Sequence, residues 1–224
     1  MMRLNTIVFD FLTALEQNND RDWFQKNKSL YQSALENVQH FAAGLIDGIS
    51  SFDPSVSNLQ AKDTIFRIYR DVRFSPDKRP YKTHFGVFIA PNGKKSSDAG
   101  YYLHIENDMS MVGGGLWCPE NSLLKKIREE IYYAPEDLVE ILENKTFKAT
   151  FGALANVENL KRPPKGYSAD FEHINLLQYR HYTVERKVSN KEVLDDTFID
   201  LSLNTFKTMF PLVDYMNKLI RLEE

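Results

Sequence analysis

Cysteine is almost absent from the chain, since Cys118 is the only one among 224 residues. A single thiol can form no disulfide within the chain and no cluster of cysteine ligands for a metal. No apolar run approaches the roughly 20 residues that a membrane helix needs. Asp10 interrupts the first apolar segment before it reaches the length of a signal peptide. We therefore expect a cytoplasmic protein with no membrane partner, in which Cys118 is a buried packing residue.

An excess of positive charge is also lacking, because 28 Lys and Arg stand against 31 Asp and Glu and leave a net charge of −3. A protein that coats nucleic acid without specificity would be basic. The charge is nevertheless uneven. Between Lys62 and Lys95, nine Lys or Arg stand against three Asp, a local excess of +6, so the remaining residues sum to −9. A positive site within an acidic protein attracts a specific anion, and the expected partner is an anionic small molecule.

Composition and length are those of one globular domain over residues 1–224, with 42% apolar and 26% charged residues. Apolar residues recur with the helical period over 6–17 and again from Leu30 to Ile49. β-Branched and aromatic residues then favour strands at 64–73, 84–91, 100–107 and 109–118. Because short turns join the last three, these strands should be mostly antiparallel. The predicted class is α+β, with N-terminal helices at 6–50, a central sheet of about four to six strands based on 64–118, and helices from both ends covering it.

The remaining segment, 119–224, is expected to supply helices and one last strand. Its predicted elements are helices at 120–132 and 136–143, an irregular stretch at 147–152, a short helix at 171–178, a strand at 179–189, a helix capped by Asn190 and reaching about 204, and a helix at 206–222 with Pro211 near its start or at a kink. The residues expected to be buried are Trp23, Phe41, Phe66, Ile68, Leu103, Ile105 and Ile127.

Charged and apolar residues alternate most densely in the expected strand 64–73. Side chains of a strand point alternately to its two faces. One face would carry Phe66, Ile68, Arg70 and Val72, and the other Arg67, Tyr69, Asp71 and Arg73. Three arginines in seven residues, none with an adjacent Glu, indicate a site that binds an anion.

Two prolines restrain the connection that follows this strand. Pro76 lies in a turn that begins at Ser75, and Pro80 disfavours the helical conformation for Arg79. Asp77 and Lys78 therefore lie on a stiff basic loop between two predicted strands.

These residues also carry a family resemblance. The segment from Phe66 to Ser75, followed by Asp77-Lys78 and by Pro80 to Thr83, resembles the central motif of the family catalogued as domain of unknown function 2461. The other matching pieces are Asn18-Asn19, Trp23-Phe24, Tyr31, residues 100–105, residues 113–117, Arg128 and residues 161–167. The resemblance covers nearly the whole chain. The family's name assigns no activity, so the resemblance adds no function to the argument from the residues.

The favoured hypothesis is a cationic site on the central sheet that binds, and in one form turns over, a small molecule bearing a phosphate or carboxylate. The candidate ligand-binding residues are Arg67, Tyr69, Arg70, Arg73, Lys78, Arg79, Lys82 and Tyr102. The candidate catalytic residues are Asp71, His84 and His104, because imidazole and carboxylate groups transfer protons near neutral pH.

Two alternatives remain open. In the first, Arg67–Asp71 and Arg73–Asp77 pairs would form a purely structural salt network that holds the strand and the loop together. The protein would otherwise be a binding module that docks its basic loop on nucleic acid, a less favoured partner, or on an acidic protein. No motif identifies a cofactor, since Gly113-Gly114-Gly115 lacks the spacing of a phosphate-binding fingerprint. No metal site is predicted either, because His84, His104 and Glu106 follow no compact ligand spacing.

Overall fold

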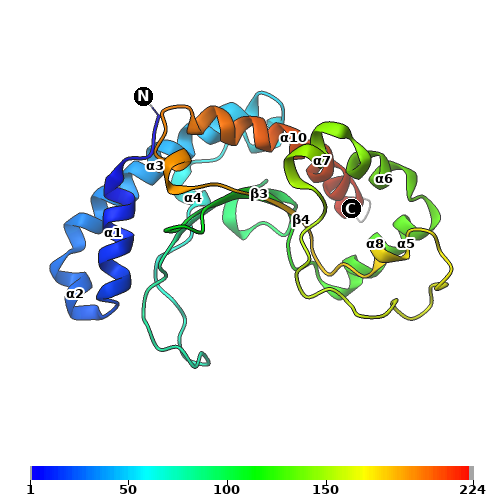
Figure 1. Cartoon of the computed structure of the whole chain (residues 1–224), viewed down its shortest axis with the longest axis horizontal. Helices are drawn as coiled ribbons and strands as arrows, with labels where there is room; N and C mark the ends of the chain where they lie inside the picture. Colours follow the sequence, from blue (N-terminus) through cyan, green and yellow to red (C-terminus); the bar gives the residue numbers. More distant parts are fainter. Residues whose placement is uncertain (1, 222–224) are drawn as a thin grey trace.

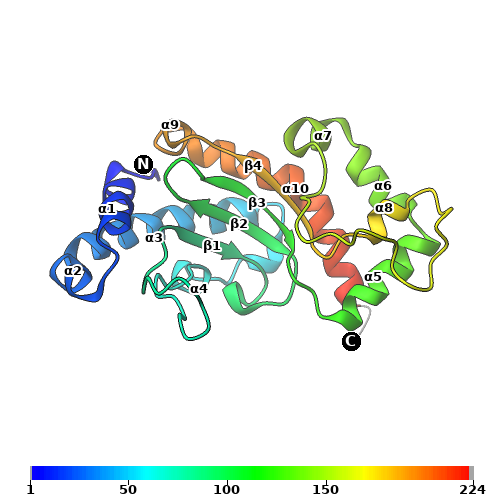
Figure 2. The same ribbon diagram turned by 60° about the horizontal axis from the view of Figure 1, so that its bottom comes forward.

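A four-stranded antiparallel sheet forms the centre of the computed structural model, which describes residues 2–221. The strands follow the chain order β1-β2-β3-β4 across the sheet (Figure 2). They are β1 (Phe85–Ile89), β2 (Gly100–Ile105), β3 (Met111–Leu116) and β4 (Tyr182–Lys187). The predicted α+β class, with helices from both ends of the chain packed on an antiparallel sheet, is confirmed.

Helices precede and follow the sheet in the described part of the chain. The N-terminal ones are α1 (Thr6–Gln17), α2 (Arg21–Lys26), α3 (Lys28–Ser50) and α4 (Ala61–Thr64). The later ones are α5 (Asn121–Tyr133), α6 (Glu136–Glu143), α7 (Lys145–Phe151), α8 (Ile174–Leu177), α9 (Asn190–Val193) and α10 (Phe198–Arg221). None of these described helices combines the length and apolar character needed to cross a membrane.

The two longest helices, α3 and α10, lie on the same face of the sheet (Figure 1). Alternate strand residues point toward them and are buried, as in Val87 of β1 and Leu103 of β2. The ring of Tyr101 packs edge-on against Phe206 of α10 at 5.4 Å. The main core therefore lies between the sheet and these helices. A long loop and the part of the chain that carries α5 and α8 extend on the side of the opposite sheet face (Figure 1).

Residues 64–73 do not form the predicted strand. Thr64 ends α4, and the segment beyond it makes only two isolated bridges, Ile65 with Val87 and Tyr69 with Tyr81. Two further hydrogen bonds, Arg70 N–H to Pro80 O and Lys82 N–H to Ile68 O, join the two sides of the loop. Pro80 has no N–H to continue the ladder of hydrogen bonds, so the pairing stops at Pro80. We call residues 66–82 the basic loop; it extends away from the sheet (Figure 1).

The helical predictions after residue 140 need three corrections. Residues 145–151 form α7 rather than an irregular stretch, because the Asn144 side chain accepts hydrogen bonds from the Thr146 and Phe147 amides of the first turn. Ser189, not Asn190, caps α9, through a capping box with Glu192. Finally, α9 ends at Val193, and α10 runs unbroken from residue 198 through Pro211, since its inner face stays buried along its length.

The core predictions are mostly confirmed. The buried residues are Phe41, Ile68, Leu103, Ile105 and Ile127. Trp23 and Phe66 are only partly buried. Cys118 is exposed rather than packed; it lies two residues after the end of β3 and has a positive φ of 52°.

Asn217 joins α10 to the start of β2 inside the core. Its amide accepts from Ala99 N–H at 2.8 Å and donates to Ala99 O at 3.1 Å. Asn217→Ala would leave both backbone groups buried without partners, and we expect a loss of about 2 kcal/mol or more in the free energy of unfolding. Urea denaturation measures this loss. Asn204→Ala, at an exposed position of the same helix, should change stability by less than about 0.5 kcal/mol; equal effects would contradict the prediction.

Candidate binding site on the uncovered face of the sheet

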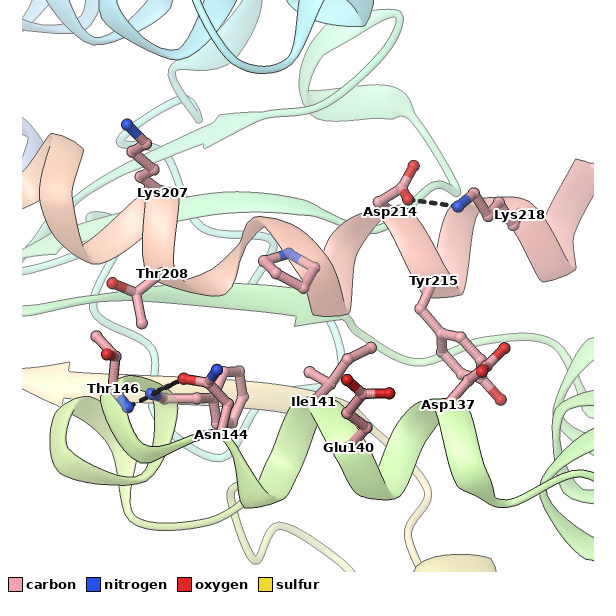
Figure 3. Close-up of a pocket in the computed structure, with 12 residues that line it drawn as sticks. Asp137, Glu140, Ile141, Asn144, Thr146, Lys207, Thr208, Asp214, Tyr215 and Lys218 are labelled. Carbon is pink, nitrogen blue, oxygen red and sulfur yellow. Dashed lines mark hydrogen bonds and ion pairs between the residues drawn. The ribbon is translucent and has the colours of Figure 1, made fainter.

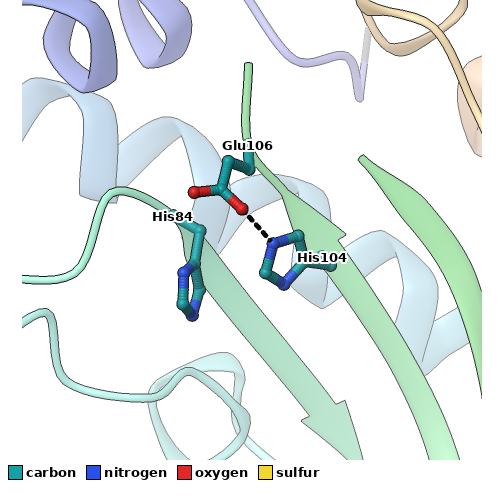
Figure 4. A group of neighbouring side chains, drawn as sticks. All are labelled: His84, His104 and Glu106. Atoms are coloured by element: carbon teal, nitrogen blue, oxygen red, sulfur yellow. Dashed lines mark hydrogen bonds and ion pairs between the residues drawn. The ribbon is translucent and has the colours of Figure 1, made fainter. Parts of the chain in front are cut away.

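Polar side chains gather on the sheet face that α3 and α10 do not cover. On β2 the residues of this face are Tyr102 and His104, with Glu106 directly after the strand. His84 directly precedes β1, and the pairing of Phe85 with Ile105 places it beside Glu106. Figure 4 shows His84, His104 and Glu106 converging from the two adjacent segments.

A hydrogen-bonded series runs along β2. Tyr102 Oη lies 3.0 Å from His104 Nδ1, and His104 Nε2 lies 2.9 Å from Glu106 Oε2. Thr83 Oγ1 donates to the other oxygen of Glu106 at 2.7 Å. An ionised carboxylate only accepts, so in a neutral His104 the Nε2 atom carries the proton and Nδ1 accepts from the tyrosine hydroxyl. The series can relay a proton between a phenol and a carboxylate.

The surroundings set the charge of these groups. Burial favours a high pKa for Glu106, but the hydrogen bonds from His104 and Thr83 outweigh burial and lower it. Burial, followed by the nearby His104, lowers the pKa of His84 to about 4, although Glu106 acts in the opposite direction. Burial and the charge of Glu106 raise the pKa of Tyr102 to about 12. At neutral pH the site thus holds a carboxylate, a protonated phenol and a neutral His84.

His84 makes no hydrogen bond or ion pair with any described residue, and its ring lies 4.3 Å from that of His104 between centroids. One potential ligand atom from each of His84, His104 and Glu106 lies within 4.8 Å of the other two. Two imidazoles and a carboxylate are a donor set found in transition-metal centres.

A cavity of about 430 Å³ lies over the same face. Its apolar wall comes from Phe66 of the basic loop, Phe88 of β1, Met111 of β3 and Trp117 after β3. The remaining lining residues are Lys94, Ser96, Ser97, Asp98, Tyr102, Gly114, Gly115, Ala155, Val157, Thr183, Val184 and Glu185. Tyr102 belongs both to this wall and to the hydrogen-bonded series, so the cavity and the polar group form one site.

The basic loop uses much of its charge internally. Asp77 receives hydrogen bonds from Arg70 at 2.7 Å and from Arg79 at 2.9 Å. The hydrogen bonds from Arg79, then that from Arg70, hold the pKa of Asp77 far below its ordinary value. Arg73 forms a forked pair with Asp71, with a shortest distance of 2.7 Å. A structural salt network is therefore present, but its pairs are not the predicted ones, because Asp71 is held by Arg73 rather than Arg67, and Asp77 by Arg70 and Arg79 rather than Arg73.

The other predicted site residues of the loop fall into two groups: those with contacts inside the loop, and those with no side-chain hydrogen bond or ion pair among the described residues. Lys78 Nζ donates to Val72 O at 3.0 Å within the loop, and Tyr69 packs against Phe24 and Tyr81. Arg67 and Lys82 make no side-chain hydrogen bond or ion pair among the described residues. The Lys82 ammonium lies over the Phe66 ring, 5.4 Å from its centroid. Burial, followed by the charge of Arg67, lowers the pKa of Lys82.

The structure thus brings together Tyr102, His84 and His104, with Lys82 beside the cavity wall. It separates them from the loop network that contains Arg70, Asp71, Arg73, Lys78 and Arg79. Glu106 was considered from the sequence only as a metal ligand and was not chosen as a site residue, because it follows no compact ligand spacing with His84 and His104. Sequence reasoning also missed Phe66, Phe88 and Trp117, which the residue pattern does not distinguish from core residues.

A second cavity, of about 580 Å³, lies between α10 and the α6–α7 segment (Figure 3). Its charged groups include Asp214, which is paired with Lys218 at 2.8 Å. Burial, with the charges of Glu130 and Asp137, raises the pKa of Tyr215, so its hydroxyl stays protonated. The cavity shares no lining residue with the sheet cavity, and none of its lining residues is a predicted site residue. The sheet cavity is lined by the predicted residue Tyr102, so we take the sheet face as the candidate site.

The chain was compared with known proteins. A family model described as conserved hypothetical protein (DUF2461) matches residues 7–215. No curated protein and no solved structure matches the chain. The match spans the basic loop, the sheet and most of α10.

Proposed function

Since the chain belongs to this family, whose description names no activity, we propose a function from the geometry: the protein binds a small organic molecule that carries a phosphate or carboxylate group. The molecule occupies the cavity on the uncovered face of the sheet. The observation that carries the proposal is the position of unpaired Lys82 against Phe66, a residue of the cavity wall.

The cavity suits an organic ligand in size and lining. Small-molecule sites commonly measure about 300–1,000 Å³ and are mostly apolar with a few polar groups, and this cavity measures about 430 Å³. Phe66, Phe88 and Trp117 provide aromatic surface, and Trp117 is 60% exposed. Flat rings stack well on such side chains. A ligand with an aromatic body fits this wall best.

Lys82 and Arg67 supply the charge for the anionic end of the ligand. The charge of Arg67 lowers the pKa of Lys82, so the two cations are close enough to repel each other. Neither makes a hydrogen bond or ion pair with a carboxylate among the described residues, although the charge of Arg67 also acts on Asp71. An anion between them relieves this repulsion and forms charge-assisted hydrogen bonds. Tyr102 and His104 then face the ligand as hydrogen-bonding and proton-transfer groups.

The same charges argue against docking of the basic loop on nucleic acid. Arg70, Arg73 and Arg79 are held by Asp71 and Asp77. A nucleic-acid surface needs several such cations free to contact phosphates. These three arginines are already paired with carboxylates of the loop, so a small anion at Lys82 is the better-supported ligand.

The test uses three probes: inorganic phosphate, adenosine monophosphate and benzoate, titrated by calorimetry. We expect at least one of the two organic anions to bind, and Lys82→Ala and Arg67→Ala to weaken its affinity by about 10-fold or more, the usual size of a hydrogen bond to a charged group. Arg73→Ala is the matched control, because Arg73 is paired with Asp71, and it should bind as the wild type does.

The outcomes separate the two functions. Binding that survives Lys82→Ala and Arg67→Ala but fails in Arg73→Ala would place the anion in the basic loop and overturn the proposal. Tight binding of a single-stranded oligonucleotide with a steep salt dependence, without binding of any small anion, would establish the docking module instead. Melting temperatures of all variants show whether a lost affinity reflects a lost fold.

A further inference from the structure

We propose that His84, His104 and Glu106 form a binding site for one divalent first-row transition metal ion. The three side chains converge on the uncovered face of the sheet, from the residue before β1 and from β2 and its end (Figure 4). The linear sequence hides this site, because His84 and Glu106 meet only through the pairing of β1 with β2.

The donor set selects the class of metal. Imidazole nitrogen suits zinc, iron(II), nickel and copper, whereas magnesium and calcium prefer oxygen ligands. Two histidines and one carboxylate are the three protein ligands of several zinc and non-haem iron sites, in which further positions stay open for water or substrate. The proposed site has this composition.

The distances allow one ion to contact all three groups. One ligand atom from each residue lies within 4.8 Å of the others, and His104 Nε2 is 2.9 Å from Glu106 Oε2. Metal–ligand bonds of about 2.0–2.2 Å keep any two ligands within about 4.4 Å of each other. The widest separation therefore has to shorten by no more than about 0.4 Å for one ion to contact all three groups.

Neighbouring groups hold the ligands as they do in metal centres. Histidine ligands usually donate their second N–H to a polar partner, and ligating carboxylates are also hydrogen-bonded. With Nε2 of His104 on the ion, Nδ1–H donates to Tyr102 Oη, which lies 3.0 Å away. Thr83 holds the second oxygen of Glu106 at 2.7 Å. Both ligands of β2 are therefore oriented before an ion arrives.

The position of His84 distinguishes a metal site from a plain hydrogen-bonded pair. His104 and Glu106 satisfy each other without a third group. His84 lies against the His104 ring and makes no hydrogen bond or ion pair with any described residue. A metal ion gives its nitrogen a partner. One carboxylate leaves the bound ion with net positive charge, and the charge of Lys82 also acts on His84, so an anion from the cavity is a suitable further ligand.

The experiment measures metal uptake alone and does not depend on any organic ligand. Full-length protein is freed of metal with a chelator, and zinc binding is followed by competition with a chromophoric chelator. Cobalt(II), used as a second probe, reports the ligand geometry by its visible absorption. We expect one zinc per chain, a loss of about 100-fold or more in affinity in His84→Ala and Glu106→Gln, and a loss of about 10-fold in Thr83→Val.

His40→Ala is the control, because His40 is exposed on α3, and it should bind zinc as the wild type does. Circular dichroism checks the fold of each variant, and His84→Asn replaces His84→Ala if the latter unfolds. Wild-type protein that takes up no zinc, or a folded His84 variant that binds zinc as well as the wild type does, overturns the proposal. Phosphate titrations with and without zinc then show whether failure of metal binding and failure of anion binding are separate results.

Discussion

Phe24→Ala should lower the free energy of unfolding by about 3–5 kcal/mol, the range measured for truncation of buried phenylalanines. Phe24 is 1% exposed. Its ring stacks on Tyr81 at 4.0 Å between centroids and contacts Tyr69 at 5.8 Å. Tyr31 lies 5.1 Å away on its α3 side. The substitution removes the ring that packs both sides of the basic loop against the N-terminal helices. We therefore expect local opening of the loop in addition to the loss of global stability.

Two measurements together test this expectation. Chemical denaturation gives the loss of stability, and hydrogen exchange gives the opening of residues 66–82. The comparison variant is Phe41→Ala, whose ring stacks on Phe198 at 5.5 Å in the main core. It should cost a similar free energy without a selective rise in exchange in the basic loop. If both variants raise loop exchange equally, the aromatic cluster does not anchor the loop.

Gly113→Ala should cost at least about 3 kcal/mol, at the upper end of the range for inserting atoms into a filled interior. A Cβ at this position would lie 2.1 Å from Val184 O and 2.8 Å from Glu185 Cα. Both contacts are backbone atoms of the neighbouring strand, which no side-chain rotation relieves. β3 and β4 would have to move apart at the part of the sheet that lines the cavity.

Gly152→Ala provides the control for this glycine. Gly152 has a positive φ of 74°, but a Cβ there meets nothing within 4 Å. Its replacement should therefore cost only the backbone strain of an alanine held at φ 74° and ψ −68°, about 1–3 kcal/mol. Thermal and urea unfolding compare the two variants. A cost at Gly113 no larger than that at Gly152 would mean that the strands adjust easily and that the close approach is unimportant.

Regular periodicity made most of the fold predictable. The apolar stripe of 6–17 coincides with α1, and the β-branched, aromatic alternation of 84–91 and 100–107 contains β1 and β2. Local sequence patterns fail to predict the secondary structure of a segment when a tertiary contact determines it. Segment 64–73 has strand composition, but only its first residues reach the edge of β1, and its later ones turn away to pair with residues 80–82 of the same loop.

The candidate site was predictable only in part, for a related reason. The type of each residue indicated acid–base or anion chemistry at Tyr102, His84 and His104, and the structure brings these together. Which arginines remain unpaired depends on the folding of the loop onto Asp71 and Asp77, a property of geometry rather than of sequence spacing. The nearness of His84 to Glu106 depends in the same way on strand register.

The irregular chain that lies along the two outer edges of the sheet has a consequence for association between molecules. An open strand edge exposes unpaired N–H and C=O groups and recruits strands from other chains into aggregates. Here Phe66 N–H bonds to Gly86 O at 2.9 Å on the outer edge of β1, and Ala155 N–H bonds to Thr183 O at 2.7 Å on the outer edge of β4. Both edges of the described sheet are thus partly occupied by non-strand chain, which protects the protein from edge-to-edge aggregation while keeping the sheet at four strands.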